Sequence, residues 1–572
     1  MLGNAAVARG LYEAGCQVAS SYPGTPSTEI TQSISEYDEI YSEWATNEKV
    51  AMEVAFGASL AGKRSFTGMK HVGLNVAADP LFTLSYTGVN AGMVIAVADD
   101  PGMHSSQNEQ DSRHYARAAK LPMLEPADSS ECLQFAKIAY ELSEKYDTPV
   151  LIRMCTRIAH SQSIVELSER KEQPTKEYVK NAPKYVMMPG FARARHPILE
   201  SRMRDLVDMA EETPLNRVEM GGTEIGVVTS GTAYQYVKEA FGDSVSVLKL
   251  GMVHPLPEKL IIDFASKVKK LVVVEELDSI IEDHCKKIGL AVTGKDIFPL
   301  EGEFSQNLVA EKLGAPDIQK PQLEEAVPQR PPVMCAGCSH RGLFYTLSKL
   351  KATVLGDIGC YTLGSTPPLS AMDSTICMGA SISSLHGFAR AGGKNCVCVV
   401  GDSTFIHMGV GGLIDIAYNG SDSTVIILDN STTGMTGHQD NPTTGYNIKG
   451  EPAGKIDLEA LCEAIGIKRV RVVDPYDLKA CEEAVKEEMA ASGPSVIIAR
   501  RPCALLKTTK TKPPLTVDKE KCTGCKICMR LGCPAISIKD KKADINQTLC
   551  VGCDLCSQLC KFGAFVKTAR EG

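Results

Sequence analysis

The chain has 572 residues, 44% of them hydrophobic and 23% charged, and its formal net charge is −8 at pH 7. This composition excludes disordered and collagen-like chains, no run approaches the ~18 apolar residues of a membrane helix, and the acidic balance argues against general nucleic-acid binding. The first residues, MLGNAAVARG, lack the basic region and apolar core of a signal peptide, so we expect a cytoplasmic protein.

The alternation of helical and strand-like patterns predicts a multidomain α/β protein with doubly wound parallel sheets. In the first block, residues 1–165, a helical pattern at 48–62 precedes expected buried strands at 92–100 and 147–156. Residues 166–219 are polar and charged, and we interpret them as a linker or surface excursion.

Two further α/β blocks follow, at 220–318 and 330–506, joined by a proline-rich connection at 320–333. Their expected strands are apolar runs that end in polar residues. These runs are 224–233 and 269–277 in the first of the two blocks, and 395–402, 423–430 and 494–501 in the second. A basic linker then leads into a cysteine-rich tail, 515–572.

The tail holds eight of the 21 cysteines, which indicates metal or redox chemistry rather than disulfides. Two C-x2-C-x2-C runs each have a fourth cysteine further on, and in two-cluster ferredoxins that fourth cysteine binds the other cluster. We therefore predict a ferredoxin-like domain with two [4Fe–4S] clusters. The predicted ligands are Cys522, Cys525, Cys528 and Cys560 for one cluster, and Cys533, Cys550, Cys553 and Cys556 for the other. The alternative is a zinc module.

Two expected strands of the third block end in polar patterns, Gly401-Asp402-Ser403 and Asp429-Asn430. The pair resembles the GDG…NN motif of thiamine diphosphate enzymes, with serine and aspartate as departures from it. Mg²⁺ prefers oxygen ligands, and neighbouring parallel strands end at one sheet edge. The resemblance implies that Mg²⁺ is bound by Asp402, Asn430 and the main-chain carbonyl of Thr432, and that Gly401 and Ser403 contact the cofactor.

The first block carries YPGTPST at 22–28, Glu48 in Asn-Glu-Lys, and SFTGMKHVG at 65–73. Together these motifs resemble the pyrimidine-binding domain of the 2-oxoacid:ferredoxin oxidoreductase family. The resemblance implies that Glu48 hydrogen-bonds the aminopyrimidine ring of the cofactor and that Thr25 contacts the 2-oxoacid. Without the surrounding motifs, a surface residue in the first turn of a helix would be the better interpretation of Glu48.

The resemblance extends over almost the whole chain. It implies a pyrimidine-binding domain (1–165), a transketolase C-terminal-like domain (220–318), a diphosphate-binding domain (330–506) and a two-cluster domain (515–572). This order, with ADDPGMHSSQNEQDSRHYA at 98–116, is most similar to large subunits that act on arylpyruvates.

The reaction implied is oxidative decarboxylation of an arylpyruvate with coenzyme A, with electrons passing through [4Fe–4S] clusters to ferredoxin. The implied partners are a smaller β subunit and ferredoxin, with no nucleic acid and no membrane. Arg113 is predicted to bind the substrate carboxylate, because a guanidinium suits bidentate contact, with a surface arginine as the alternative. A non-oxidative decarboxylase, a different 2-oxoacid, or a scaffold that only retains thiamine folds are the other hypotheses.

Four further cysteines resemble the ligands of a third cluster, found near the thiamine in related pyruvate and oxoglutarate enzymes. They are Cys335, Cys338, Cys360 and Cys503. The alternative is that they are ordinary core cysteines.

Overall fold

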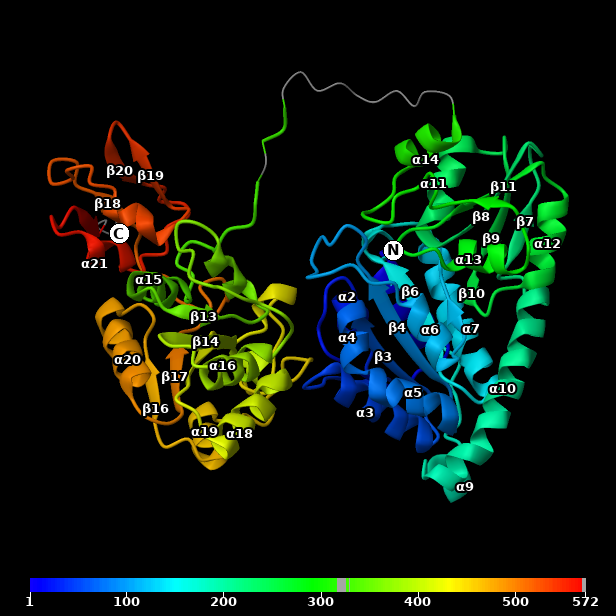
Figure 1. Ribbon diagram of the computed structural model, residues 1–572, viewed down its shortest axis with the longest axis horizontal. Helices are drawn as coiled ribbons and strands as arrows, with labels where there is room; N and C mark the ends of the chain where they lie inside the picture. The colour runs from blue at the N-terminus through cyan, green and yellow to red at the C-terminus, as the bar shows by residue number, and fades with distance from the viewer. Residues whose placement is uncertain (316–325, 329, 568–572) are drawn as a thin grey trace. The chain divides into compact units, whose positions relative to one another are not determined.

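The computed structural model describes residues 1–315, 326–328 and 330–567, and these form two units, 1–324 and 325–572 (Figure 1). The ends of the regions expected at 220–318 and 515–572, and half of the connection expected at 320–333, therefore lie outside the described residues. None of the described helices is long and apolar enough to cross a membrane.

A seven-stranded sheet forms the centre of the first unit, and all its neighbouring strands are parallel except the edge pair β10–β5. In sheet order the strands are β10 (Met252–His254), β5 (Met123–Leu124), β6 (Val150–Cys155), β4 (Met93–Asp99), β3 (Ser65–Lys70), β1 (Val18–Ser21) and β2 (Tyr41–Trp44). Every residue of β4 and β6 is buried, because helices cover both faces of a parallel sheet. The strands expected at 92–100 and 147–156 are thus confirmed.

The helices of this region are α1 (Gly3–Glu13), α2 (Thr28–Ile34), α3 (Glu48–Leu60), α4 (His71–Val76), α5 (Ala78–Thr87), α6 (Arg113–Ala119), α7 (Ser129–Tyr146) and α8 (Thr156–His160). The side chain of Asn47 accepts a hydrogen bond from Val50 N at 2.9 Å, so it caps α3 and makes Glu48 the first helical residue. The helix expected at 48–62 is confirmed.

A second sheet in the same unit has the strand order β12-β11-β8-β9-β7, parallel except for the edge strand β7. Its elements are β7 (Arg217–Glu219), β8 (Ile225–Ser230), α11 (Gly231–Phe241), β9 (Ser246–Leu250), α12 (Glu258–Ser266), β11 (Lys270–Val274), α13 (Ile280–Lys287), β12 (Val292–Thr293) and α14 (Gln306–Leu313). Between β9 and α12 the chain adds β10 to the first sheet. One strand from the chain segment that builds the second sheet, β10, therefore belongs to the first sheet.

The polar stretch 166–219 contains more regular structure than a linker. It forms α9 (Ala182–Tyr185) and the 24-residue helix α10 (Pro189–Glu212), which packs against α5 and α12 (Figure 1). Only a narrow stripe of α10 is buried, including Leu199, Leu206 and Ala210, at spacings of seven and four residues. Because the rest of the helix surface is polar, the sequence shows little apolar periodicity.

The second unit is built on the five-stranded sheet β13-β14-β15-β17-β16, all parallel. Its elements are α15 (Arg341–Leu350), β13 (Thr353–Leu355), η1 (Cys360–Ser365), α16 (Ala380–Arg390), β14 (Cys396–Gly401), α17 (Asp402–Thr404), η2 (Phe405–Gly409), α18 (Val410–Asn419), β15 (Thr424–Asp429), η3 (Gly434–Thr436), α19 (Leu458–Ile465), β16 (Val470–Val473), α20 (Leu478–Ala490) and β17 (Ser495–Arg500).

The cysteine-rich tail forms two small antiparallel pairs, β18–β21 and β19–β20. Its elements are β18 (Leu515–Val517), η4 (Ile527–Leu531), β19 (Ile536–Lys539), β20 (Lys542–Ile545), α21 (Leu555–Leu559) and β21 (Phe565–Lys567). The tail contacts α20 and the loop before it, because Gln558 accepts a hydrogen bond from Leu478 N at 3.0 Å and donates one to Tyr476 O at 2.7 Å.

Candidate functional site

Thr25 and Glu48 follow neighbouring strands at the carboxyl edge of the first sheet. Thr25 lies in the loop after β1 and is half-buried, and Glu48 follows β2. The Glu48 side chain is 4% exposed, so the alternative of a surface glutamate is wrong. A Cβ added to Gly73 would lie only 2.6 Å from Glu48 Oε1, so glycine at this position leaves room for the carboxylate.

Arg113 is placed differently from the prediction. Its side chain is 1% exposed, and its guanidinium contacts Asp111 at 2.6 Å and Glu275 at 2.5 Å. It also donates to the carbonyl oxygens of Glu276 and Asp278 at 3.1 and 3.0 Å. Because these groups already bind the guanidinium, the prediction that Arg113 binds a substrate carboxylate is wrong. The residue instead joins the two sheets of the first unit. Burial by itself would lower the pKa of Arg113, but the carboxylates of Asp111 and Glu275 outweigh it and raise that pKa.

The Arg113→Met substitution is expected to lower the melting temperature of the protein by roughly 5–10 °C, because removing one partner of a buried ion pair leaves uncompensated charge. Differential scanning calorimetry measures this shift. Arg117→Met, an exposed site on the same helix, is the matched control and should leave the melting temperature unchanged. A weakened 2-oxoacid affinity with no change in melting temperature would contradict the structural role.

The carboxyl edge of the second unit's sheet brings the two halves of the GDS…DN pattern together. Asp402 starts α17 directly after β14 and accepts hydrogen bonds from Ser403 N at 2.7 Å and Ser431 N at 2.9 Å. Ser431 has a φ of 59°, so the backbone after β15 turns sharply toward Asp402. Asn430 and Thr432 flank this residue, and both are buried.

The electrostatics of this edge suit a cation. Burial, followed by the neighbouring carboxylate of Asp429, raises the pKa of Asp402 to about 7. Opposite charge would stabilise the ionised form, and Mg²⁺ is a hard cation that binds oxygen. The Asn430 amide nitrogen lies 3.5 Å from His340 Nε2, which is compatible with an amide oxygen available for a cation. The donor set therefore fits the predicted ion. His340 precedes α15 and carries no sequence motif that reveals this contact.

The four cysteines of the candidate third set gather at the same edge. Cys360 lies after β13, Cys503 follows β17, and Cys335 and Cys338 precede α15. Cys503 N donates to Asn430 O at 2.9 Å, which ties this set to the Asp402 site. Burial raises the pKa of Cys338 to about 12 and that of Cys360 to about 11, with further contributions from neighbouring thiols of the same set. These four cysteines are therefore neighbours in space.

In the tail, each predicted set of four cysteines lines its own small hollow. One hollow is bordered by Cys522, Cys525, Cys528 and Cys560, and the other by Cys533, Cys550, Cys553 and Cys556. Backbone amides face the sulfurs, with Ala543 N, Leu515 N and Ala564 N each 3.4 Å from the Sγ of Cys522, Cys550 and Cys560. No group of three described His, Cys, Asp or Glu side chains is positioned to hold a single metal ion. Four thiols around each hollow, with backbone amides facing the sulfurs, are an arrangement that fits a [4Fe–4S] cluster.

The second of these hollows also touches the third set. Ala336 and Gly337, which separate Cys335 from Cys338, line the hollow of the Cys533 set. A Cβ on Gly337 would lie 2.0 Å from a methyl group of Val551, so glycine permits this close approach. Arg341 supports the contact by donating to Cys335 O at 2.9 Å and Leu531 O at 2.7 Å.

Comparisons with known proteins agree with the thiamine motifs. Residues 9–216 match the family model described as pyruvate flavodoxin/ferredoxin oxidoreductase, thiamine diphosphate-binding, and residues 357–499 match the C-terminal binding domain of thiamine pyrophosphate enzymes. A solved 2-oxoglutarate:ferredoxin oxidoreductase from Magnetococcus marinus is 18% identical, covers 55% of this chain and 64% of its own, and has a TM-score of 0.47, too low to add to the argument.

Curated relatives match over the whole length. The indolepyruvate oxidoreductase subunits IorA of Archaeoglobus fulgidus and Methanothermobacter thermautotrophicus are each 41% identical to this chain, with 100% of this chain and 97% of each relative covered. The same subunit of Pyrococcus horikoshii is 40% identical with the same coverage. Identity at this level over the full length shows that the chain belongs to the family of indolepyruvate oxidoreductase subunits IorA, among the thiamine-dependent 2-oxoacid oxidoreductases.

Proposed function

We propose that the chain is the catalytic subunit of an indolepyruvate:ferredoxin oxidoreductase. In this reaction the C1–C2 bond of an arylpyruvate breaks and CO₂ leaves. The remaining acyl carbon bonds to the sulfur of coenzyme A, the thiol proton is released, and two electrons pass to ferredoxin. The observation that carries the proposal is that three cysteine quartets and the Asp402–Asn430 site occupy one unit. A non-oxidative decarboxylase transfers no electrons and therefore does not need this series of cysteine sites.

Thiamine diphosphate, when bound, supplies the electron sink that makes loss of CO₂ possible. Asp402, Asn430 and the carbonyl of Thr432 would bind the Mg²⁺ of the diphosphate, with Gly401 and Ser403 beside them. In the first unit, Glu48 would hold a proton against the aminopyrimidine ring, and Thr25 would contact the 2-oxoacid. Burial of Glu48 and the cation-favouring charge around Asp402 support these roles.

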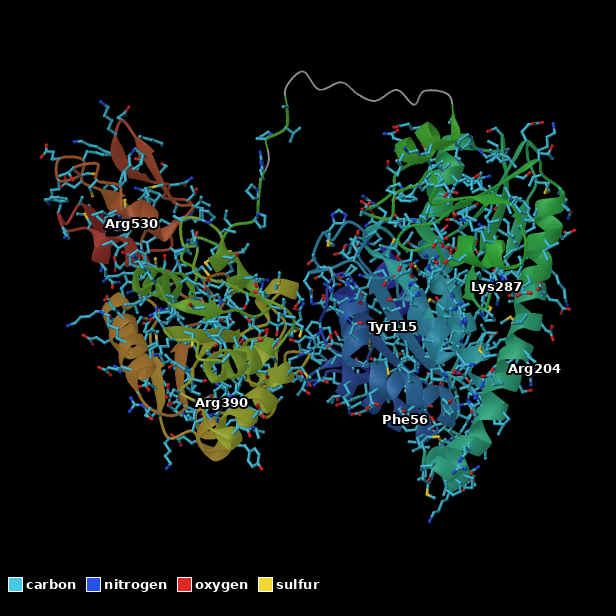
Figure 2. The ribbon with its side chains drawn as sticks, in the orientation of Figure 1. Phe56, Tyr115, Arg204, Lys287, Arg390 and Arg530 are labelled. Atoms are coloured by element: carbon cyan, nitrogen blue, oxygen red, sulfur yellow. The ribbon has the colours of Figure 1, made fainter. Side chains whose placement is uncertain are left out.

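The electrons would leave through the cysteine sites in a fixed order. The Cys335–Cys503 set adjoins the Asp402 site, and its Cys335–Cys338 loop borders the Cys533 hollow. The Cys522 hollow would come last. It includes the exposed residues Cys525, Lys526 and Phe562. Arg530, labelled in Figure 2, is also exposed on η4 beside this set. A basic surface at this exit suits docking of an acidic ferredoxin.

The test uses the chain purified anaerobically with its smaller partner subunit and loaded with iron, thiamine diphosphate and Mg²⁺. Indolepyruvate with coenzyme A is expected to bleach the visible absorption of the clusters. Release of CO₂ and an aldehyde without bleaching would contradict the proposal and favour a decarboxylase. Bleaching with pyruvate but not with indolepyruvate or phenylpyruvate would reassign the substrate.

The third cluster has its own test in iron content. Cys360→Ser is expected to lower the iron content from about 12 to about 8 atoms per chain, because a cubane that loses one thiolate ligand is destabilised. Iron analysis of anaerobically purified protein measures the change. Cys377→Ser, an exposed cysteine outside every set, is the matched control. Equal iron content in the two variants would mean that Cys360 is an ordinary core cysteine.

A further inference from the structure

A lysine that no motif singles out lies at the carboxyl edge of the first sheet. Lys70 is the last residue of β3, whose neighbour β1 leads into the loop that carries Thr25. Its aliphatic stem covers Gly24, where an added Cβ would lie 3.3 Å from Lys70 Cγ. The Lys70 side chain therefore packs against Gly24, the residue before Thr25.

The ammonium group of Lys70 is poorly compensated. Nζ donates one hydrogen bond, to Ser105 O at 2.8 Å, and no carboxylate of the described residues lies within 4 Å of it. Asp100 and Glu48 act on it only at longer range, and burial lowers the pKa of Lys70 to about 8. A partly buried cation with a single neutral partner is costly unless an anion joins it.

Two buried cations near this edge, Arg113 and Arg153, are already neutralised. Arg113 is taken up by Asp111 and Glu275, as described above. Arg153, on β6, contacts Asp99 at 2.7 Å and also pairs with Glu125. Asp100 accepts hydrogen bonds from Thr156, Ser106 and the backbone of Ser105 at 2.6–2.8 Å, and it acts on Lys70 only at longer range. Among the described residues, the partly buried Lys70 thus differs from Arg113 and Arg153 in having no carboxylate within ion-pair distance.

We propose that Lys70 binds the carboxylate of the 2-oxoacid, in the role first expected of Arg113. The inference rests on the proposed function, since it names the group that recognises that substrate's charge. A single ammonium is a point charge and holds a carboxylate less rigidly than a bidentate guanidinium. A looser hold suits a carboxylate that must leave as CO₂, because tight binding of the ground state would oppose its loss.

The experiment measures binding without turnover, so that it is independent of cluster reduction. Calorimetry with the loaded complex compares two probes of equal shape, indole-3-propionate and its neutral amide. The wild type is expected to bind the acid about 10–100-fold more tightly than the amide, as for hydrogen bonds to charged groups. Lys70→Met and Lys70→Gln should bring this ratio close to one. Lys63→Met, an exposed site just before the same strand, should keep the wild-type ratio.

Lys70→Gln separates charge from loop anchoring, because glutamine retains a donor for Ser105 O but carries no charge. A wild-type ratio in Lys70→Gln would overturn the inference and leave Lys70 as an anchor for the loop. Equal wild-type affinity for acid and amide would also overturn it, even where indolepyruvate bleaches the clusters. Conversely, absence of bleaching together with a Lys70-dependent preference for the acid would refute the proposed reaction and leave carboxylate binding standing.

Discussion

Replacing Glu48 with glutamine is expected to lower the rate of substrate-dependent cluster reduction by about 10²–10⁴-fold, the usual contribution of a positioned acid–base group. The carboxylate lies buried at the first turn of α3, and Gly73 leaves it space. Glutamine has nearly the same shape and keeps a hydrogen-bonding oxygen, but it cannot exchange a proton. Stopped-flow absorption of the clusters, started by mixing with indolepyruvate and coenzyme A, measures the rate.

The control for this prediction lies on the same helix. Glu53 is exposed and pairs with Lys49 one turn away, so Glu53→Gln should leave the rate within about twofold, as expected for a surface pair. Thiamine diphosphate content is measured in both variants, because Glu48→Gln should reduce the rate even with the cofactor bound. A near-normal rate in loaded Glu48→Gln would remove Glu48 from the proposed mechanism.

The pairing of the tail cysteines should be visible in iron content. If the sets interleave as the two hollows indicate, Cys533→Ser combined with Cys553→Ser disturbs one cluster and removes about four iron atoms per chain. Cys533→Ser combined with Cys525→Ser disturbs both clusters and removes about eight. Both double variants should fail to reduce ferredoxin, because the electron path is interrupted in each.

The opposite pattern of iron loss would contradict the interleaved sets. If each run supplied all four of its own ligands, Cys533 and Cys525 would serve one cluster, and it is their double variant that would lose about four iron atoms. Cys377→Ser again serves as the exposed control cysteine. Iron analysis and electron paramagnetic resonance of the remaining cluster distinguish the two patterns.

Local sequence patterns were sufficient to predict the buried strands and the helix that begins at Glu48. Residues 92–100, 395–402 and 423–430 form β4, β14 and β15, because strands covered on both faces are continuous apolar runs. The cysteine spacing led to the two quartets that line the tail hollows, since those ligand sets depend on short loops. By contrast, α10 buries only a narrow stripe, and its pattern was hidden among polar residues.

The sequence by itself therefore determined the α/β class, the two C-x2-C-x2-C runs and the residues that end the parallel strands, because each depends on neighbours close in the chain. Only the tertiary structure decided which of the charged side chains form ion pairs. Arg113 is neutralised by Glu275, 162 residues away, whereas Lys70 has no carboxylate within 4 Å among the described residues. Whether a cation is free to bind a substrate depends on which anions the fold brings to it. Those anions are distant in the sequence, so no local sequence pattern predicts them.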